Sequence, residues 1–338
     1  MRGLFASSAA LALSACATTP VIDSLPAVEV LASGETEPVG TANEDAADDP
    51  AIWRNSAQPS HSLIVATDKK SGLYVYGLDG KRRSFTDAGL VNNVDLVRLA
   101  DGTIMVAASD RNDPENAGLL IYELDPATGA LSRRARWRVG DGEAYGLCMV
   151  ASGAAALVYS VLKNGTIIEA RVTQASSELG YEALRTMRVA TQPEGCVVDP
   201  RNGTLYIGEE ARGIWRFTRG QSEGELVATT DGKQLVADVE GLAIAPDADD
   251  GGLLIASSQG DNAYTLYRLP QIEYVGRFRI GAGQFGATQE TDGIDLILGD
   301  FGADYPDGLF VAQDGDNRPL AQNFKLVSWQ AIKAEMGL

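Results

Sequence analysis

The strongest constraint on the fold is a repeat in which polar residues open a short apolar segment. The openings fall at Asp48, Asn93, Tyr145, Glu194, Glu240 and Asp292, and successive openings are 45, 52, 49, 46 and 52 residues apart. Repeats of about 40–50 residues that are rich in short strands are typical of β-propeller blades. Residues 328–336 form the one good helix candidate. The sequence therefore predicts an all-β fold, a six-bladed β-propeller over residues 28–338 with a short C-terminal helix, in which residues 28–39 add a strand to the last blade and close the ring.

A second polar group follows each opening, about 15–20 residues further on, where the next apolar strand ends. In the first repeat this group is Asp68, Lys69 and Lys70, and in the last repeat it spans residues 313–317. Neighbouring antiparallel strands run in opposite directions, so the start of one and the end of the next lie on the same side of a blade. We therefore expect all these polar groups to converge on one mouth of the central channel.

Charge is unevenly distributed around this predicted mouth. Blades one to three contribute Lys69, Lys70, Arg111 and Lys163, whereas blades four to six contribute mainly Glu194, Glu209, Glu210, Asp238, Glu240, Gln259, Asp292, Asp295, Asp314 and Asp316. Two carboxylates about 4 Å apart repel by about 4 kcal/mol at an effective dielectric constant of about 20, so a crowded rim favours bridging cations. Ligands that are all oxygen favour Ca²⁺. A phosphorylated anion could then bind between Ca²⁺ and the basic residues, with a Ca²⁺-activated water as the nucleophile.

The net charge limits the partners of the chain. Its formal charge is −18, with 46 acidic residues against 28 basic ones. A field of this sign repels nucleic acid and anionic membrane surfaces, so we expect neither as a direct partner. We expect a monomer that acts on a small-molecule substrate.

The segments at the mouth resemble, in order, those of the β-propeller phytases. Residues 48–53 read DDPAIW and residues 67–76 read TDKKSGLYVY, followed by NNVD at 92–95, YIGEE at 206–210, DVEGL at 238–242, ASSQG at 256–260, TDGID at 291–295 and GLFVAQDG at 308–315. The resemblance extends from about residue 40 to the C-terminus. It implies a six-bladed propeller that removes phosphate from myo-inositol hexakisphosphate (phytate) in a Ca²⁺-dependent reaction of the 3-phytase type.

The resemblance also implies roles for individual residues. Several Ca²⁺ ions would be held by Asp48, Asp49, Tyr145, Glu194, Glu210, Asp238, Glu240, Gln259 and Asp292, of which Tyr145, Glu194, Glu210, Asp238, Glu240 and Asp292 are the implied catalytic residues. Lys69, Arg111 and Lys163 would contact the phosphates of the substrate. Structural calcium is implied at Asp49 with the turn from Asn92 to Asp95, and at Asp314 in the 313–317 loop.

Two other interpretations stay open. A calcium-dependent propeller lactonase or phosphotriesterase would need a mostly acidic, apolar-lined mouth, and Lys69, Arg111 and Lys163 argue against it. A non-catalytic surface propeller that binds a partner would present exposed aromatic residues, whereas the predicted mouth is charged.

The N-terminus has the pattern of an export signal. Arg2 precedes a short apolar stretch at residues 4–13, which is too short to span a bilayer. The following residues, Leu-Ser-Ala-Cys, resemble a lipoprotein signal, so we predict a signal peptide at residues 1–15, lipidation of Cys16 and a tether over residues 16–27. An ordinary signal peptide cut a few residues later is the alternative. Either predicts export, as a lipid-anchored protein of the periplasm or outer membrane or as a secreted one.

Two cysteines lie beyond Cys16. Cys148 and Cys196 fall two or three residues into the opening strands of blades three and four. An even pair in an oxidising compartment suggests a disulfide, and the innermost strands of adjacent blades approach closely. We therefore predict a Cys148–Cys196 bridge.

Overall fold

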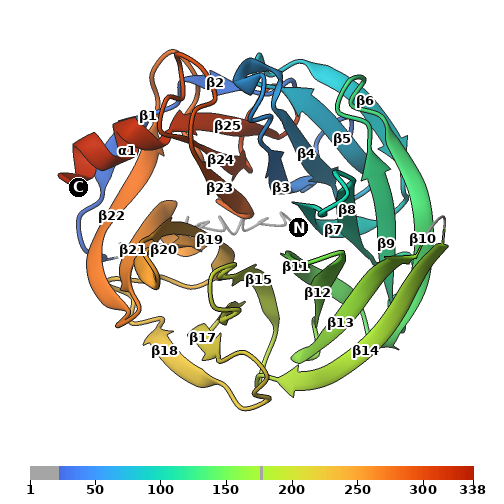
Figure 1. Ribbon diagram of the computed structural model, residues 1–338. Coiled ribbons are helices and arrows are strands. Elements are labelled where there is room, and N and C mark those ends of the chain that lie inside the picture. Colours follow the sequence, from blue (N-terminus) through green and yellow to red (C-terminus); the bar gives the residue numbers. More distant parts are fainter. Residues whose placement is uncertain (1–22, 176–177) are drawn as a thin grey trace, which may run out of the picture.

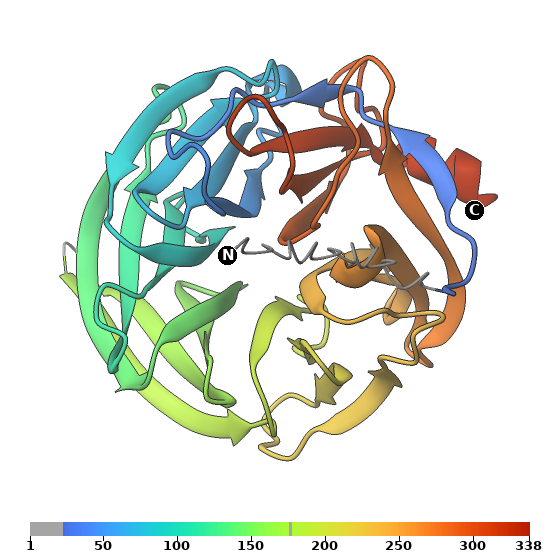
Figure 2. The same ribbon diagram turned by 180° about the vertical axis from the view of Figure 1, so that it is seen from behind.

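The computed structural model describes residues 23–175 and 178–338, and within them six sheets stand around a central axis like the blades of a propeller (Figure 1). This arrangement confirms the predicted six-bladed fold. The predicted signal peptide, Cys16 and the first part of the predicted tether lie outside the described residues. The same ring is seen from behind in Figure 2.

The first three blades each contain four antiparallel strands, numbered from the channel outward. Blade one consists of β3 (Ala47–Trp53), β4 (Leu63–Asp68), β5 (Gly72–Gly77) and β6 (Arg82–Asp87). Blade two consists of β7 (Val91–Arg98), β8 (Ile104–Asp110), β9 (Asn116–Leu124) and β10 (Leu131–Asp141). Blade three consists of β11 (Ala144–Ser152), β12 (Ala155–Leu162), β13 (Thr166–Ala175) and β14 (Glu178–Arg188).

Blade four repeats this plan, and the last two blades also take in the N-terminal segment. Blade four consists of β15 (Pro193–Val198), β16 (Leu205–Glu209), β17 (Gly213–Phe217) and β18 (Glu225–Thr229). Blade five consists of β19 (Val239–Asp247), β20 (Gly251–Ser258), β21 (Ala263–Leu269), β22 (Glu273–Gly281) and β1 (Val28–Leu31). Blade six consists of β23 (Ile294–Leu298), β24 (Gly308–Asp314), β25 (Asn323–Ser328) and β2 (Gly34–Glu35).

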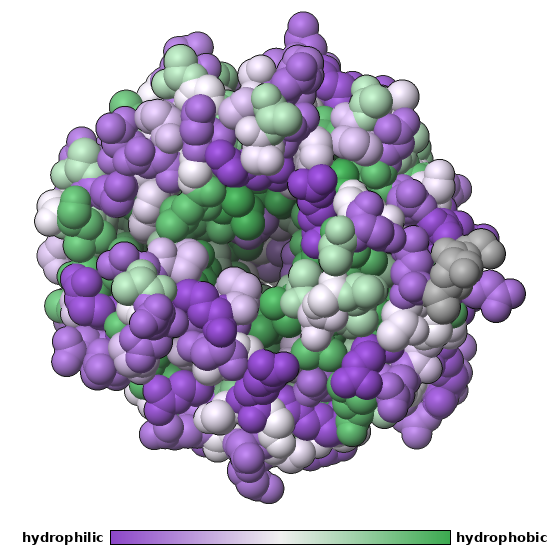
Figure 3. Space-filling model, viewed as in Figure 1, coloured by the Kyte–Doolittle hydropathy of each residue, from purple (hydrophilic) through white to green (hydrophobic). Residues whose placement is uncertain are grey.

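The core lies between the blades. The second strand of blade one, β4, is buried at every position, whereas its outermost strand, β6, has only exposed and half-buried residues. A strand covered on both faces needs apolar residues throughout, and a strand with one wet face needs them only at every second position. Between blades one and two, for example, Trp53 and Val65 pack in one cluster with Val94 and Val106. The outer surface is largely hydrophilic, and the centre of the disc is hollowed (Figure 3).

The N-terminal segment closes the ring as predicted and also extends a second blade. We expected residues 28–39 to add a strand to the last blade, and β2 pairs antiparallel with β25 in blade six (Figure 1). In addition, β1 pairs in parallel with β22 in blade five. The segment therefore ties two blades together, because β1 extends blade five beyond β22 and β2 extends blade six beyond β25.

Three inter-blade ties come from one equivalent position of the inner strands. Cys148 forms a disulfide with Cys196 of the next blade, with their Cα atoms 5.6 Å apart. At the same position in blades two and six, Asp95 Oδ2 accepts the Met149 amide at 2.7 Å and Asp295 Oδ2 accepts the Ile52 amide at 2.8 Å. Adjacent inner strands lie close enough here for either a covalent or a hydrogen-bonded bridge.

The predicted C-terminal helix is present as α1 (Trp329–Met336). It is preceded by Ser328, whose side chain makes no capping bond, and ends at Gly337 in the left-handed conformation that favours glycine. Trp329 and Ile332 pack into the core of blades five and six. Among the described residues there is no helix with the length and apolarity needed to cross a membrane.

Candidate functional site

The site begins with β-bulges that open the inner strands. The pairing register shifts between the first and fourth residues of β3, β7, β11, β15 and β19. A bulge inserts unpaired residues and turns their side chains away from the regular alternation of the strand. The residues in these bulges are the polar openings on which the repeat was recognised. Each bulge, and in blade six the turn before β23, presents one equivalent side chain to the mouth: Asp48, Asn92, Tyr145, Glu194, Glu240 and Asp292.

Glycines set the spacing of this inner ring of side chains. A Cβ on Gly146 would lie 1.8 Å from the Glu194 carbonyl oxygen, and one on Gly195 would lie 2.0 Å from the Glu240 carbonyl oxygen. No larger residue fits, because the backbone of the next blade occupies that space. The glycine after each acidic residue in Glu194-Gly195 and Glu240-Gly241 therefore lets the inner strands of neighbouring blades approach.

A second, outer ring of residues is held by one repeated backbone hydrogen bond. The residue directly after the second strand of each blade donates its amide to a carbonyl just before the inner strand. The donors are Lys69, Arg111, Lys163, Glu210, Gln259 and Gly315, and the acceptors are Ala46, Leu90, Glu143, Gln192, Asp238 and Gln289. This bond places the end of the second strand beside the start of the inner strand in every blade. The two polar groups therefore meet at one mouth of the channel, as predicted.

Carboxylates crowd one part of the mouth. Oxygens of Asp48, Glu194 and Asp292 lie within 4.8 Å of one another, and so do oxygens of Glu194, Glu210 and Glu240. Glu194 belongs to both groups, so the groups are contiguous. Glu210 is half-buried and the others are buried.

The electrostatics of this acidic cluster call for a cation. Burial raises the pKa of Glu194 to about 8, and the carboxylate of Asp48 adds to the effect. Burial, with help from Glu194, also raises the pKa of Glu240 well above its usual value. Asp48 Oδ1 and Glu240 Oε2 are buried and have no hydrogen-bond partner in residues 23–175 and 178–338. An unpartnered buried oxygen costs about 1–3 kcal/mol, which a bound cation would offset. The donors are all oxygen, so the cluster fits Ca²⁺.

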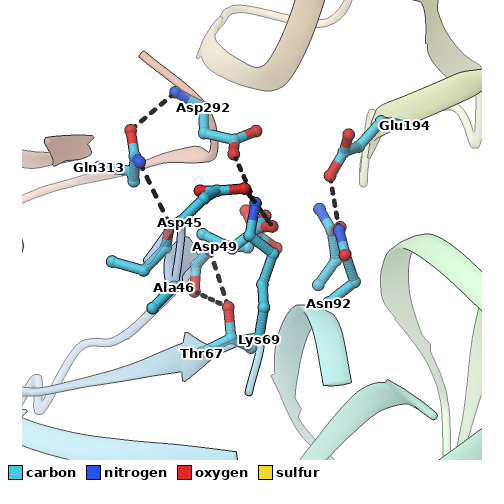
Figure 4. A network of polar contacts seen from close by, with 12 residues as sticks. Asp45, Ala46, Asp49, Thr67, Lys69, Asn92, Glu194, Asp292 and Gln313 are labelled. Carbon is cyan, nitrogen blue, oxygen red and sulfur yellow. Dashed lines mark hydrogen bonds and ion pairs between the residues drawn. The ribbon is translucent and has the colours of Figure 1, made fainter. Parts of the chain in front are cut away.

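Lys69 lies within the acidic cluster (Figure 4). Its Nζ is 2.8 Å from Asp45 Oδ2, 3.1 Å from Asp48 Oδ2 and 3.3 Å from Asp292 Oδ2. Burial disfavours the ammonium, but Asp48 and Asp292 raise the pKa of Lys69 above its usual value, so it stays charged. The side chain therefore neutralises part of the cluster, rather than facing it from an opposite half of the ring as the sequence suggested.

Arg111 and Lys163 form a separate cationic pair over Tyr145. The Arg111 guanidinium carbon is 5.6 Å from the centroid of the Tyr145 ring, and Lys163 Nζ is 4.4 Å from it. Both cations also contact Glu143: Arg111 Nη2 pairs with Glu143 Oε1, and Lys163 Nζ is 3.4 Å from the same oxygen. Burial, and then the Glu194 carboxylate, raises the pKa of Tyr145, so its hydroxyl stays neutral.

Asn92 connects the cationic pair to the acidic cluster. Its Oδ1 accepts a hydrogen bond from Arg111 Nη1, and its Nδ2 donates to Glu194 Oε1 at 2.6 Å (Figure 4). Gln313 fixes the other side of the cluster: Oε1 accepts the Asp292 amide at 3.0 Å, and Nε2 donates to the Ala47 carbonyl at 3.2 Å. These two amides hold the backbone and the carboxylates in place from both sides.

The predicted structural-metal residues lie in different surroundings. Asp49 and Asp95 lie deeper in the channel with Asp295, where Asp49 Oδ2 accepts the Val94 amide at 3.0 Å. Asn92 belongs to strand β7 and to the rim network described above, not to a turn. Asp314 Oδ2 lies 3.0 Å from Lys325 Nζ, so a lysine of the chain already neutralises it. The structural-calcium sites stay a prediction.

The remaining predicted ligands lie at the edge of the acidic cluster. Asp238 is half-buried, and its negative charge helps to raise the pKa of Glu210, although burial is the larger cause. Gln259 lines an open cavity of about 550 Å³ together with Asp45, Glu290, Asp292 and Gln313. This cavity offers a substrate space directly beside the cluster.

Sequence reasoning missed some residues and misplaced another. Asp45 and Glu143 both contact cations of the mouth, and each precedes a recognised opening by two or three residues. Extending the aligned repeats two positions further back would have placed Glu143 level with Asp238. Glu209 was expected on the rim, but it is buried and accepts hydrogen bonds from Thr191 and from Trp215 Nε1. Adjacent residues of a strand face opposite ways, so only Glu210 reaches the mouth.

Together, fold and site define a six-bladed propeller whose mouth places clustered carboxylate oxygens beside basic side chains. The family model for phytase matches residues 2–337. The sequence is 37% identical over 331 residues to 3-phytase of Bacillus subtilis (strain 168), covering 91% of this chain and 86% of that protein. The chain therefore belongs to the phytase family and is a hydrolase of phosphate monoesters. This membership favours the phosphate-monoester hydrolase over the lactonase or phosphotriesterase and over the non-catalytic propeller.

Among solved structures, a chain in the crystal structure of a mitotic checkpoint complex is similar, with a TM-score of 0.53 and 14% sequence identity. The alignment covers 97% of this chain and 87% of that one. At this identity the likeness shows the fold alone.

Proposed function

We propose that this phytase is calcium-dependent and removes a phosphate from phytate as a 3-phytase. The observation that carries the calcium requirement is the pair of buried, unpartnered oxygens, Asp48 Oδ1 and Glu240 Oε2, inside the acidic cluster. Asp48, Glu194, Glu240 and Asp292 are buried, and Glu210 adds a fifth carboxylate. These residues would hold Ca²⁺, with Asp238, Gln259 and Tyr145 at the edge of the cluster.

The charge of the substrate also calls for bound cations. Phytate is a polyanion, and this chain carries a formal charge of −18. When bound, Ca²⁺ would neutralise phosphate charge and activate a water molecule for attack on phosphorus. The catalytic role of the cluster follows from its position beside the open cavity lined by Gln259 and Asp292.

The basic residues bind and orient phosphate groups in this proposal. Lys69 approaches from within the cluster, while Arg111 and Lys163 approach from over Tyr145. Arg111 suits two parallel hydrogen bonds to phosphate because its guanidinium is planar, and Asn92 already holds one edge of it. A substrate with several phosphates can therefore reach both the cluster and the cationic pair.

The test is phosphate release from phytate by chelated and then Ca²⁺-restored protein. Chelation should abolish hydrolysis and lower the melting temperature, since an ion at 100 times its Kd stabilises the folded state by about 2.7 kcal/mol. Restoring Ca²⁺ should recover both.

Variants locate the calcium requirement. Glu194→Ala and Asp238→Ala should each lower kcat by about 100-fold or more, since each removes a ligand. In calcium-free buffer neither should lower the melting temperature much, because like-charge repulsion falls. Glu182→Ala is the matched control: Glu182 pairs with Arg171 at 2.8 Å on the outer strands of blade three and should leave activity unchanged. Full activity in excess chelator, or near-normal turnover in both ligand variants, would refute the proposal.

Export with a lipid on Cys16 stays a prediction. The same protein expressed with its own N-terminus can test it, by incorporation of labelled fatty acid into wild type but not into Cys16→Ser.

A further inference from the structure

Glu143 occupies the position between the two cations where a phosphate would be expected. Its Oε1 pairs with Arg111 Nη2 and lies 3.4 Å from Lys163 Nζ. The three side chains are between 21% and 30% exposed, so these charges are only partly screened by water. A carboxylate oxygen shared by an arginine and a lysine makes the same kind of contact as a phosphate oxygen.

The backbone holds Glu143 in this place. Its carbonyl accepts the Lys163 amide at 3.2 Å, which is the bond that recurs between the outer ring and the start of each blade. Asp238 accepts the equivalent bond in blade five. Glu143 therefore occupies the position in blade three that Asp238 occupies in blade five. Its side chain contacts two cations, whereas Asp238 lies near the Glu210 carboxylate.

Only one side of Arg111 is committed to this contact. Its Nη1 donates to Asn92 Oδ1, which is in turn tied through its amide to Glu194. Arg111 thus stays in place when Glu143 moves away, while Lys163 keeps its contact with the Tyr145 ring. The Glu143 carboxylate can leave without dismantling the cationic pair.

We propose that Glu143 is a specificity-determining residue whose carboxylate holds the Arg111–Lys163 pair when no phosphate is present and competes with phosphate for it. The inference rests on the proposed function, in which this pair binds substrate phosphate. Inorganic phosphate has only its own contacts with Arg111 and Lys163 to offset the loss of the Glu143 contacts. A substrate with several phosphates has further contacts at the acidic cluster and displaces it more readily. Glu143 therefore disfavours binding of released inorganic phosphate relative to binding of phytate.

The experiment compares Glu143→Gln with Asp141→Asn. Both variants remove one negative charge from the same turn, but Asp141 pairs with Arg138 and not with the cationic pair. The inhibition constant of inorganic phosphate against phytate hydrolysis is measured at fixed free Ca²⁺, and phosphate binding is measured directly by calorimetry. Glu143→Gln should bind inorganic phosphate about tenfold more tightly than wild type, while Asp141→Asn should change its affinity less than twofold.

The remaining outcomes separate this inference from the proposed function. Equal changes in Glu143→Gln and Asp141→Asn would show a general field effect and would overturn the competition. Weaker phosphate binding in Glu143→Gln would mean that Glu143 only positions the cations, and it too would overturn the proposal. Arg111→Ala is the reference for the site. If it binds phosphate as well as wild type does, the phosphate-binding role of the pair is wrong; if it binds more weakly while Glu143→Gln is unchanged, the inference about Glu143 alone is wrong.

Discussion

Lys69 and Lys325 are each buried beside carboxylates, one at the mouth and the other inside blade six. Lys325 Nζ contacts Glu35, Asp314 Oδ2 at 3.0 Å and Asn323 Oδ1 at 3.1 Å, and its side chain is completely buried. Lys69 contacts Asp45, Asp48 and Asp292, and its side chain is 10% exposed. Lys325 contacts two carboxylates. Lys69 contacts three, and the carboxylate of Glu194 lies close to two of them.

The comparison shows how a buried charge cluster can serve structure or function. Around Lys325, both carboxylates contact the lysine. The Asn323 side chain donates to Glu35 and accepts from Lys325, so the polar groups of β2, β24 and β25 satisfy one another. At the mouth, the carboxylates outnumber the lysine and leave Asp48 Oδ1 and Glu240 Oε2 unpartnered. A surplus of buried negative charge is costly in the isolated chain, and it is the property that a cation site requires.

The largest effect that would sharpen this comparison is expected from Lys325→Met. The variant leaves the carboxylates of Asp314 and Glu35 without their cation, which should cost about 3–5 kcal/mol of the free energy of unfolding. Denaturant unfolding with and without Ca²⁺ measures the loss, and the deficit should be the same in both. Lys333→Met is the control, because its pair with Asp307 is partly exposed and is worth about 1 kcal/mol or less. Rescue of Lys325→Met by Ca²⁺ would contradict the contrast and would instead support the predicted metal role of Asp314.

A smaller effect is expected from Lys69→Met. Unlike that of Lys325→Met, its stability deficit should depend on Ca²⁺. Loss of a phosphate contact and of the charge beside Asp48 should lower kcat/KM for phytate by about 100-fold. The stability deficit should be large in chelator and should narrow when Ca²⁺ is added, because the ion neutralises the same carboxylates. Steady-state kinetics and unfolding at two Ca²⁺ concentrations test both statements. If Ca²⁺ does not change the stability deficit of Lys69→Met, Lys69 is a structural residue like Lys325.

The smallest effect concerns an acid with no lysine beside it. Asp295 is held by the amides of Ile52 and Leu296, and burial raises its pKa to about 6 although these amides oppose the shift. Its unfolded pKa is near 3.9. Because the folded pKa is higher, its contribution to stability is full below about pH 4 and is lost as the pH rises through about 6, by about 3 kcal/mol in total.

Asp295→Asn should remove this decline. Urea unfolding in calcium-free buffer at several pH values between about 4 and 6.5 measures it, as the difference between wild type and variant at each pH. Burial also raises the pKa values of Asp95 and Glu194 to about 8, so both groups lose stability across this same window, but they are present in both proteins and the difference at each pH isolates Asp295. Parallel curves for the two proteins would show that Asp295 does not titrate there.

The sequence predicted the inner strands and the mouth because the repeat marks both directly. Glu194-Gly195 and Glu240-Gly241 each combine a carboxylate of the acidic cluster with the glycine that lets the next blade approach, so the pattern contains its own structural reason. The same regularity placed Cys148 and Cys196 on facing strands, where the structure joins them.

What the sequence did not predict depends on contacts across the ring. Lys69 meets Asp292 over a separation of 223 residues, and no local pattern states which charges will face each other at that distance. The split of β1 and β2 between two blades was missed for a related reason: strands of four and two residues carry too little pattern to specify an edge. Glu209 was misplaced because a shift of one residue along a strand exchanges its two faces.

The tie between the N-terminal segment and blade six also imposes an order in time. Glu35 meets Lys325 across 290 residues, and the Ala46 amide meets Gln322 across 276. Such distant contacts close the longest loops and cannot form before the final strands have been synthesised. Asp48 follows this tie directly in the chain and depends on it for its place beside Asp292. The carboxylates of the acidic cluster come from blades one, four, five and six, so the cluster is complete only once this tie has closed the ring.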